Sequence, residues 1–126
     1  MKKYPLLLSD TAVHECITEA CTYNRVPELI CQISFEWNKR YTVVAGRAWF
    51  QDMRIVLSVP IMNKMHVWDQ RETVIHETCH LIAWHLSEHI GHGQPWKKAM
   101  VLAGYVPQKF HNVQVARKSA ARGPKR

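Results

Sequence analysis

The stretch His76-Glu77-Thr78-Cys79-His80 places two histidines and a glutamate at the spacing that a metal-dependent hydrolase requires. Two histidines four positions apart on a helix lie about 40° apart around its axis, so both imidazoles can reach one metal ion. The glutamate after the first histidine can accept a proton from a water molecule that the metal activates. Because the motif is short, a chance match has a probability of roughly a few per cent, and the rest of the chain must support it.

A third metal ligand must come from outside this motif, since a catalytic zinc ion usually has three protein ligands and one position for water. The downstream candidates are His85, Glu88, His89 and His92. On an unbroken helix, His85 lies about 140° and His89 about 180° from His80, so both point away from the metal. Glu88 lies only eight residues after His80 on the same helix, which is too close for a carboxylate ligand that returns from a second helix. His92 follows Gly91, where the chain can double back, and is the best candidate.

The other histidines carry weaker signals. His14, His66, His85, His89 and His111 are expected to be surface or partly buried residues without a metal. His89 could instead support a ligand through an outer hydrogen bond, as commonly happens around ligating imidazoles.

The segment around the motif has helical spacing. Asp69 is a good N-cap, and Glu72 three residues later completes a capping-box-like pair. A common apolar face is predicted for Ile75, Cys79, Ile82 and Leu86, and this face must dock on a sheet. Cys79 is therefore interpreted as a packing residue and not as a ligand. Gly91 is predicted to end the helix as a left-handed cap.

The remaining segments predict an α+β fold. A first helix, capped by Ser9 or Asp10, buries Val13, Cys16, Ile17 and Ala20, and it ends near residues 24–27. Strands are predicted at residues 31–37, 47–51 and 54–58, with 41–44 extended, and a last helix at residues 96–103. We expect an N-terminal helix, a small three-stranded and mostly antiparallel sheet, the motif-bearing helix and a C-terminal helix.

Length and composition fit one compact domain. The chain has 126 residues, of which 47% are hydrophobic, and no apolar run could cross a bilayer. The apolar stretch near Met1 is too short for a secretory signal. Four cysteines without C-x-x-C spacing favour free, mostly buried thiols in an intracellular protein, cytoplasmic, nucleoid-associated or nuclear. We expect a monomer with a domain at residues 1–115 and a flexible basic tail at 116–126.

The charge of the chain is one-sided. The formal net charge is +7, and no Asp or Glu occurs from His89 to Arg126. Such a region can contact DNA without reading its sequence, although a tail that only maintains solubility is the alternative. The candidate nucleic-acid or substrate contacts are Arg47, Lys97, Lys98, Arg117, Lys118, Arg122, Lys125 and Arg126.

Four motifs in order resemble the SprT-like metalloprotease domain. They are Ala45-Gly46-Arg47-Ala48, Ile55-Val56-Leu57-Ser58, Val74-Ile75-His76-Glu77-Thr78-Cys79-His80, and His92-Gly93 with Trp96, and the resemblance covers about residues 8 to 106. The family includes Spartan and the germ-cell nuclear acidic peptidase. The resemblance implies a zincin-like fold, one zinc ion held by His76, His80 and His92, and Glu77 as catalytic base. It also implies degradation of proteins on DNA, notably those covalently trapped there.

One departure bears on the DNA part of that role. Many relatives carry a cysteine-rich zinc ribbon after the protease domain, whereas this sequence has no cysteine after Cys79. Any DNA contact that the ribbon supplies in those relatives must here come from the basic tail or from partners.

Other functions and roles stay open at this point. The strand at residues 47–51 could hold a protein substrate by edge pairing. Tyr105 is a candidate for stabilising the oxyanion, although packing is the commoner role past a helix end. Core or groove positions are expected for Trp49, Phe50, Trp84 and Trp96. The rival functions are a DNA-binding module with a structural zinc and no protease activity, and a hydrolase of a small molecule or cell-wall peptide.

Overall fold

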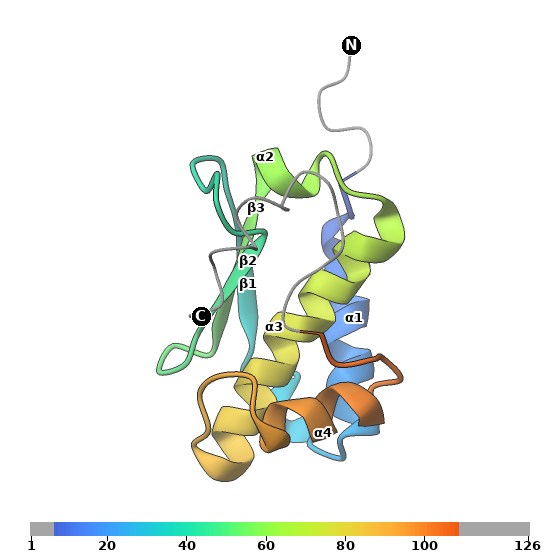
Figure 1. The fold of residues 1–126 in the computed structure, drawn as a ribbon, viewed down its shortest axis with the longest axis vertical. Helices are drawn as coiled ribbons and strands as arrows, with labels where there is room; N and C mark the ends of the chain where they lie inside the picture. Colours follow the sequence, from blue (N-terminus) through green and yellow to red (C-terminus); the bar gives the residue numbers. More distant parts are fainter. Residues whose placement is uncertain (1–6, 109–126) are drawn as a thin grey trace.

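The computed structural model describes residues 7–108, which form an α+β arrangement around one long helix (Figure 1). The elements are α1 (Asp10–Tyr23), the 3-10 turn η1 (Pro27–Leu29), β1 (Ser34–Asn38), β2 (Gly46–Trp49), β3 (Arg54–Ser58), α2 (Val59–Met62), α3 (Val67–Ser87) and α4 (Gln94–Leu102). The sheet and α1 lie on different sides of α3, and α4 packs near the C-terminal end of α3. The predicted fold class is confirmed. Among the described helices, none is long and apolar enough to span a bilayer.

The sheet is mixed, and this corrects the expectation of a mostly antiparallel one. The strand order is β1-β3-β2, with β1 parallel and β2 antiparallel to β3. Each strand runs opposite to the one before it in the chain. Because β3 inserts between β1 and β2, however, the parallel strands β1 and β3 are neighbours in the sheet. The link at residues 39–45 is not a strand. It leaves β1 through a turn in which Asn38 Oδ1 accepts from the backbone N–H groups of Arg40 and Tyr41.

Helix α1 forms as its sequence predicts. Ser9 Oγ accepts a hydrogen bond from the backbone N–H of Ala12 at 3.0 Å, which makes Ser9 the N-cap. The predicted apolar stripe is fully buried, and Cys21 joins it. At the other end, Asn24 Nδ2 donates to the carbonyl oxygens of Ala20 and Ala99, which ties α1 to α4.

Both predicted ends of α3 are wrong by a few residues. The helix begins at Val67, because His66 Nδ1 accepts from the N–H of Trp68 at 3.1 Å and acts as the N-cap. Asp69 lies inside the first turn, where its negative charge complements the positive end of the helix dipole. The helix ends at Ser87, since Glu88 takes the left-handed conformation at φ 53° that was expected of Gly91.

The predicted face of α3 is buried except at its last residue. Ile75, Cys79 and Ile82 have no exposed surface, whereas Leu86 is 60% exposed. Leu86 belongs to the final turn of the helix, and it forms part of a surface groove instead of the core.

Ser58 joins three segments at the end of β3. Its Oγ accepts from the N–H of Ile61, which caps α2, and donates to the carbonyl oxygen of Tyr41 at 2.7 Å. Ser58 is fully buried, so both bonds are shielded from water.

We predict that Ser58→Ala lowers the free energy of unfolding by about 2 kcal/mol, because a helix cap and a second hydrogen bond are lost together. Ser9→Ala is the matched control. It removes a single exposed cap and should cost about 1 kcal/mol or less. Urea unfolding of both variants measures the difference, and an equal cost would contradict the double role of Ser58.

Candidate metal centre and active site

Three imidazoles converge where α3 passes the loop that joins it to α4. His76 and His80 come from α3 and are 4% and 7% exposed, and His92 comes from the loop. The Nε2 atom of His92 lies 3.2 Å from Nε2 of His76 and 3.2 Å from Nε2 of His80. The candidate ligand atoms of the three residues all lie within 4.8 Å of one another. The three histidines are therefore positioned to hold one metal ion.

The spacing of these nitrogen atoms fits a tetrahedral ion. Two nitrogen ligands about 2.05 Å from zinc, at the tetrahedral angle, are about 3.3 Å apart. The two separations of 3.2 Å from Nε2 of His92 are close to this value. Three neutral imidazoles are also a donor set that zinc accepts readily.

Trp96 of α4 fixes the three rings from one side. Its indole is fully buried, and its centroid lies 4.8 Å, 5.5 Å and 4.6 Å from the ring centroids of His76, His80 and His92. Its Nε1 donates to the carbonyl oxygen of His76 at 3.2 Å. On another side, the edge of Phe50 packs on His80. Trp96 thus joins α4 to the middle of α3 at the candidate site.

The loop that carries His92 is shaped by two left-handed residues and one hydrogen bond. Glu88 and Gly91 have φ values of 53° and 108°. The backbone N–H of Gly93 donates to Nε2 of His89 at 3.1 Å. A Cβ atom on Gly93 would come within 2.8 Å of the His89 ring, so a side chain at this position would require that ring to move. His89 therefore positions the backbone beside His92, whereas the sequence suggested an outer partner of a ligand ring.

Glu77 lies in the wall of a pocket beside the histidines. It is 6% exposed. The pocket has a volume of about 180 Å³ and is lined by Gly46, Arg47, Ala48, Phe50, Glu77, His80, Ile90 and Gly91. A Cβ atom on Gly46 would lie only 3.2 Å from Cγ of Glu77. The absence of a side chain at Gly46 lets β2 approach α3 closely enough to form one wall of this pocket.

The comparison with known families agrees with this geometry. A family model described as SprT-like matches residues 11–119. The chain belongs to the SprT-like family. This is a metallopeptidase-type family, so the family and the three histidines together support a metalloprotease-like function. A search of curated proteins found no match.

In this SprT-like chain, the buried cysteines are packing residues. Cys79 is fully buried within α3, and burial raises the pKa of its thiol well above the ordinary value. Burial likewise raises the pKa of Cys16 to about 11 and the pKa of Cys21 to about 12. These thiols stay neutral near pH 7 and are poor metal ligands, because only a thiolate coordinates strongly. Cys31 is exposed.

Tyr105 packs against the core, which is the commoner role for a tyrosine past a helix end, and it is not among the residues that line the pocket at Glu77. It packs against the core beside Glu19 and Tyr23, in a groove that shares no residue with the pocket at Glu77. Its pKa is raised, first by burial and then by the nearby Cys16 and Glu19. The N–H of Tyr105 donates to the carbonyl oxygen of Met100 in α4, and this places Tyr105 beside Glu19 and Tyr23 of α1.

The aromatic residues divide between the site and the sheet surface. Phe50 lines the pocket and contacts Trp84, and Trp96 belongs to the core. Trp49, expected in the core or a groove, is instead 40% exposed on β2. The guanidinium carbons of Arg47 and Arg54 lie 5.8 Å and 5.6 Å from the centroid of its ring.

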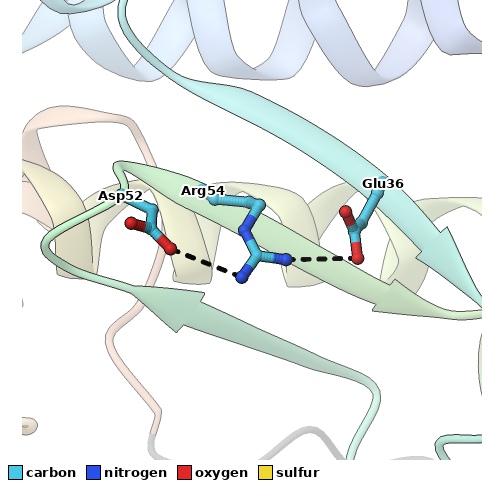
Figure 2. A network of polar contacts seen from close by, with 3 residues as sticks. All are labelled: Glu36, Asp52 and Arg54. Atoms are coloured by element: carbon cyan, nitrogen blue, oxygen red, sulfur yellow. Dashed lines mark hydrogen bonds and ion pairs between the residues drawn. The ribbon is translucent and has the colours of Figure 1, made fainter.

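Arg54 is itself neutralised by two carboxylates. It pairs with Glu36 at 3.2 Å and with Asp52 at 3.5 Å, bridging β1 and the turn before β3 (Figure 2). Two positive and two negative side chains therefore meet around Trp49. These four side chains together carry no net positive charge that would attract a phosphate backbone.

The three candidate basic contacts within residues 7–108 do not all line one site. Arg47 lines the pocket at Glu77, Lys98 lines a separate groove, and Lys97 is exposed on α4. Arg117, Lys118, Arg122, Lys125 and Arg126 lie outside the described residues, as does the predicted tail.

Two close backbone approaches at the site were not predicted from the sequence. Neither the contact of Gly46 with Glu77 nor the bond from Gly93 to His89 has a periodic signature. The glycines themselves were the available signal, since each stands beside a residue of the site.

We predict that the protein binds one Zn²⁺ or Co²⁺ ion and that His92→Ala weakens this binding by more than about 100-fold, since a ligand is lost. His89→Ala should weaken it by roughly 10- to 100-fold through misplacement of the loop. His85→Ala, on an exposed histidine of the same helix, is the control and should leave affinity unchanged. Competition with a chromophoric chelator measures all three, and unchanged affinity in His92→Ala would exclude this ligand set.

Proposed function

We propose that this protein is a zinc-dependent endopeptidase that cleaves DNA-bound or DNA-crosslinked proteins. The observation that carries the proposal is that Glu77 and His80 line one pocket, and that His80 belongs to a group of three histidines positioned to hold one metal ion. Family membership supports the metallopeptidase part. The one-sided basic charge of the sequence supports the DNA part.

Strand β2 suits the binding of an extended peptide. Among the described strands, β2 lies at the edge of the sheet, with β3 paired to one of its sides. Its residues Gly46, Arg47 and Ala48 line the pocket that contains Glu77. A substrate that pairs with the outer edge of β2 would run its backbone past the carboxylate. Such pairing reads main-chain groups and few side chains, which suits an enzyme with many protein substrates.

The chemistry follows from the residues of this pocket. A zinc ion held by His76, His80 and His92 would polarise the scissile carbonyl and lower the pKa of a water molecule to about 7. Glu77 would accept the proton of the attacking water and deliver it to the leaving amine. The burial of Glu77 and the close backbone of Gly46 hold the carboxylate in place for both transfers.

The structural-zinc alternative predicts a fourth protein ligand and no adjoining pocket. In residues 7–108, the group of candidate donors comprises three histidines, and the adjoining pocket includes Glu77. This arrangement favours a catalytic ion. A hydrolase of a small molecule or cell-wall peptide fits the same pocket, and an effect of DNA on the rate distinguishes the two enzymes.

We predict that Glu77→Gln retains one metal ion and lowers the peptidase rate by about 100-fold or more, because a general base is lost. The assay is cleavage of casein and of a DNA-bound histone, with and without DNA. Glu15→Gln, at an exposed position of α1, is the matched control. Cleavage by the Glu77 variant at the parental rate would remove Glu77 from the mechanism.

We predict that Gly46→Ala lowers the peptidase rate by about tenfold at unchanged metal affinity, because its Cβ would displace Glu77 by a few tenths of an ångström. The same Cβ would lie 3.3 Å from Cγ2 of Thr73. Gly46→Ala combined with Thr73→Ser removes that second contact only, so the double variant should stay slow. Full recovery in the double variant would show that Thr73, and not Glu77, transmits the effect.

We predict that truncation after Val115 weakens DNA binding and reduces its salt dependence. Five cations are removed: Arg117, Lys118, Arg122, Lys125 and Arg126. If each of the five contacts a phosphate, the magnitude of the slope of log K against log salt should fall by about 3.5 to 4.5, since each contact contributes about 0.7 to 0.9. Unchanged binding would place the DNA contact in the rest of the chain.

A further inference from the structure

A second concave surface lies away from the pocket at Glu77, where the ends of α1 and α3 meet α4. It has a volume of about 470 Å³, and its lining includes Tyr23, Arg25, Leu86, Pro95, Lys98 and Leu102. It shares no lining residue with the pocket at Glu77. We call it the α4 groove. Figure 1 shows its elements at the end of the molecule opposite α2.

Large apolar side chains stand exposed around the α4 groove. Tyr23 is 57% exposed, Leu86 is 60% exposed and Leu102 is 46% exposed. Single exposed apolar residues are ordinary, but three around one concavity are typical of an interaction surface. The small side chains of Ala83 and Ala99 form part of the lining and leave room between them. The groove can therefore accept apolar side chains from a partner.

The floor of the α4 groove is already fixed. Asn24 lies in its lining, is 8% exposed, and donates from Nδ2 to the carbonyl oxygens of Ala20 at 2.9 Å and Ala99 at 3.1 Å. The bond to Ala99 joins the end of α1 to α4, and the bond to Ala20 holds the Asn24 side chain against α1. Because the groove is preformed, its residues lose little conformational entropy when a partner binds.

The charge of the α4 groove selects its occupant. Among the described residues that line it, Arg25 and Lys98 carry charge, both positive, and no carboxylate is present. The segment after residue 108 is a poor occupant, because its charged residues are all basic. A second copy is disfavoured for the same reason, since the chain has a net charge of +7.

We propose that the α4 groove docks an acidic amphipathic helix of a partner protein. Its apolar residues, spaced three or four apart, would contact Tyr23, Leu86 and Leu102. Its carboxylates would face Arg25 and Lys98. Tyr23 is the single aromatic side chain among the described lining residues, which favours such a helix over a single-stranded nucleic acid, whose successive bases stack on aromatic side chains. This docking does not rest on peptidase activity.

The test is a selection from a display library of random peptides on the full-length protein. Enriched sequences should be acidic, with apolar residues at helical spacing. Fluorescence anisotropy with synthetic copies of the enriched peptides should show binding to Arg25→Glu/Lys98→Glu that is at least about tenfold weaker than binding to the parent protein. Peptides with their glutamates changed to lysine should bind that variant and not the parent. Leu86→Ser/Leu102→Ser, at two exposed positions, should also lose binding.

The control is Lys39→Glu/Lys64→Glu, which makes the same change of charge at two exposed lysines outside the groove and should bind as the parent does. Circular dichroism checks that every variant is folded. Enrichment of basic or neutral peptides would overturn the proposal, as would equal binding to Arg25→Glu/Lys98→Glu. Competition by a single-stranded oligonucleotide that depends on Arg25 and Lys98 would assign the groove to nucleic acid instead.

Discussion

The contact of one indole with three imidazoles is the interaction on which the rest of the site depends. The two histidines of α3 are placed by helical spacing alone, but His92 arrives on a loop that could adopt many paths. Trp96 removes that freedom, because it is buried against all three rings and hydrogen-bonded to the backbone of His76. Since Trp96 lies in the first turn of α4, the packing of α4 on α3 sets the end of the loop. A metal ion would then bind to ligands that are already close to their final positions.

A second constraint acts from the sheet. The backbone of Gly46 approaches Glu77 so closely that any side chain there would touch the carboxylate-bearing residue. Because Gly46 pairs with Leu57 of β3, whose side chain is buried in the core, the distance between β2 and α3 is fixed by core packing. The same packing therefore determines both the position of Glu77 and the position of the free strand edge beside it. The distance between the Glu77 carboxylate and a substrate paired to that edge would therefore stay constant.

What the sequence could predict was local. Helical spacing predicted that His76 and His80 share a face and that Cys79 faces the core, and the glycine at position 91 predicted a chain reversal before His92. What it could not predict depends on contacts between distant segments. The insertion of β3 between β1 and β2 is decided by the whole core, and the turn of Tyr105 towards α1 is decided by α4 packing. The predicted caps of α3 were wrong for a different reason. His66 is the N-cap and Glu88 the left-handed C-cap, although Asp69 and Gly91 have the stronger propensity for these positions.

The distribution of charge separates the two kinds of recognition that the proposed function requires. Near Trp49, Arg54 pairs with both Glu36 and Asp52, so the charges of these three residues and Arg47 sum to zero on this part of the sheet. The excess positive charge of the sequence lies after His89 instead. Capture of a peptide by β2 would then rest on main-chain hydrogen bonds, which salt affects little, whereas attraction of a polyanion would rest on charges that salt screens strongly. An enzyme built this way can be concentrated on DNA by one part of its chain without restricting which protein the other part cuts.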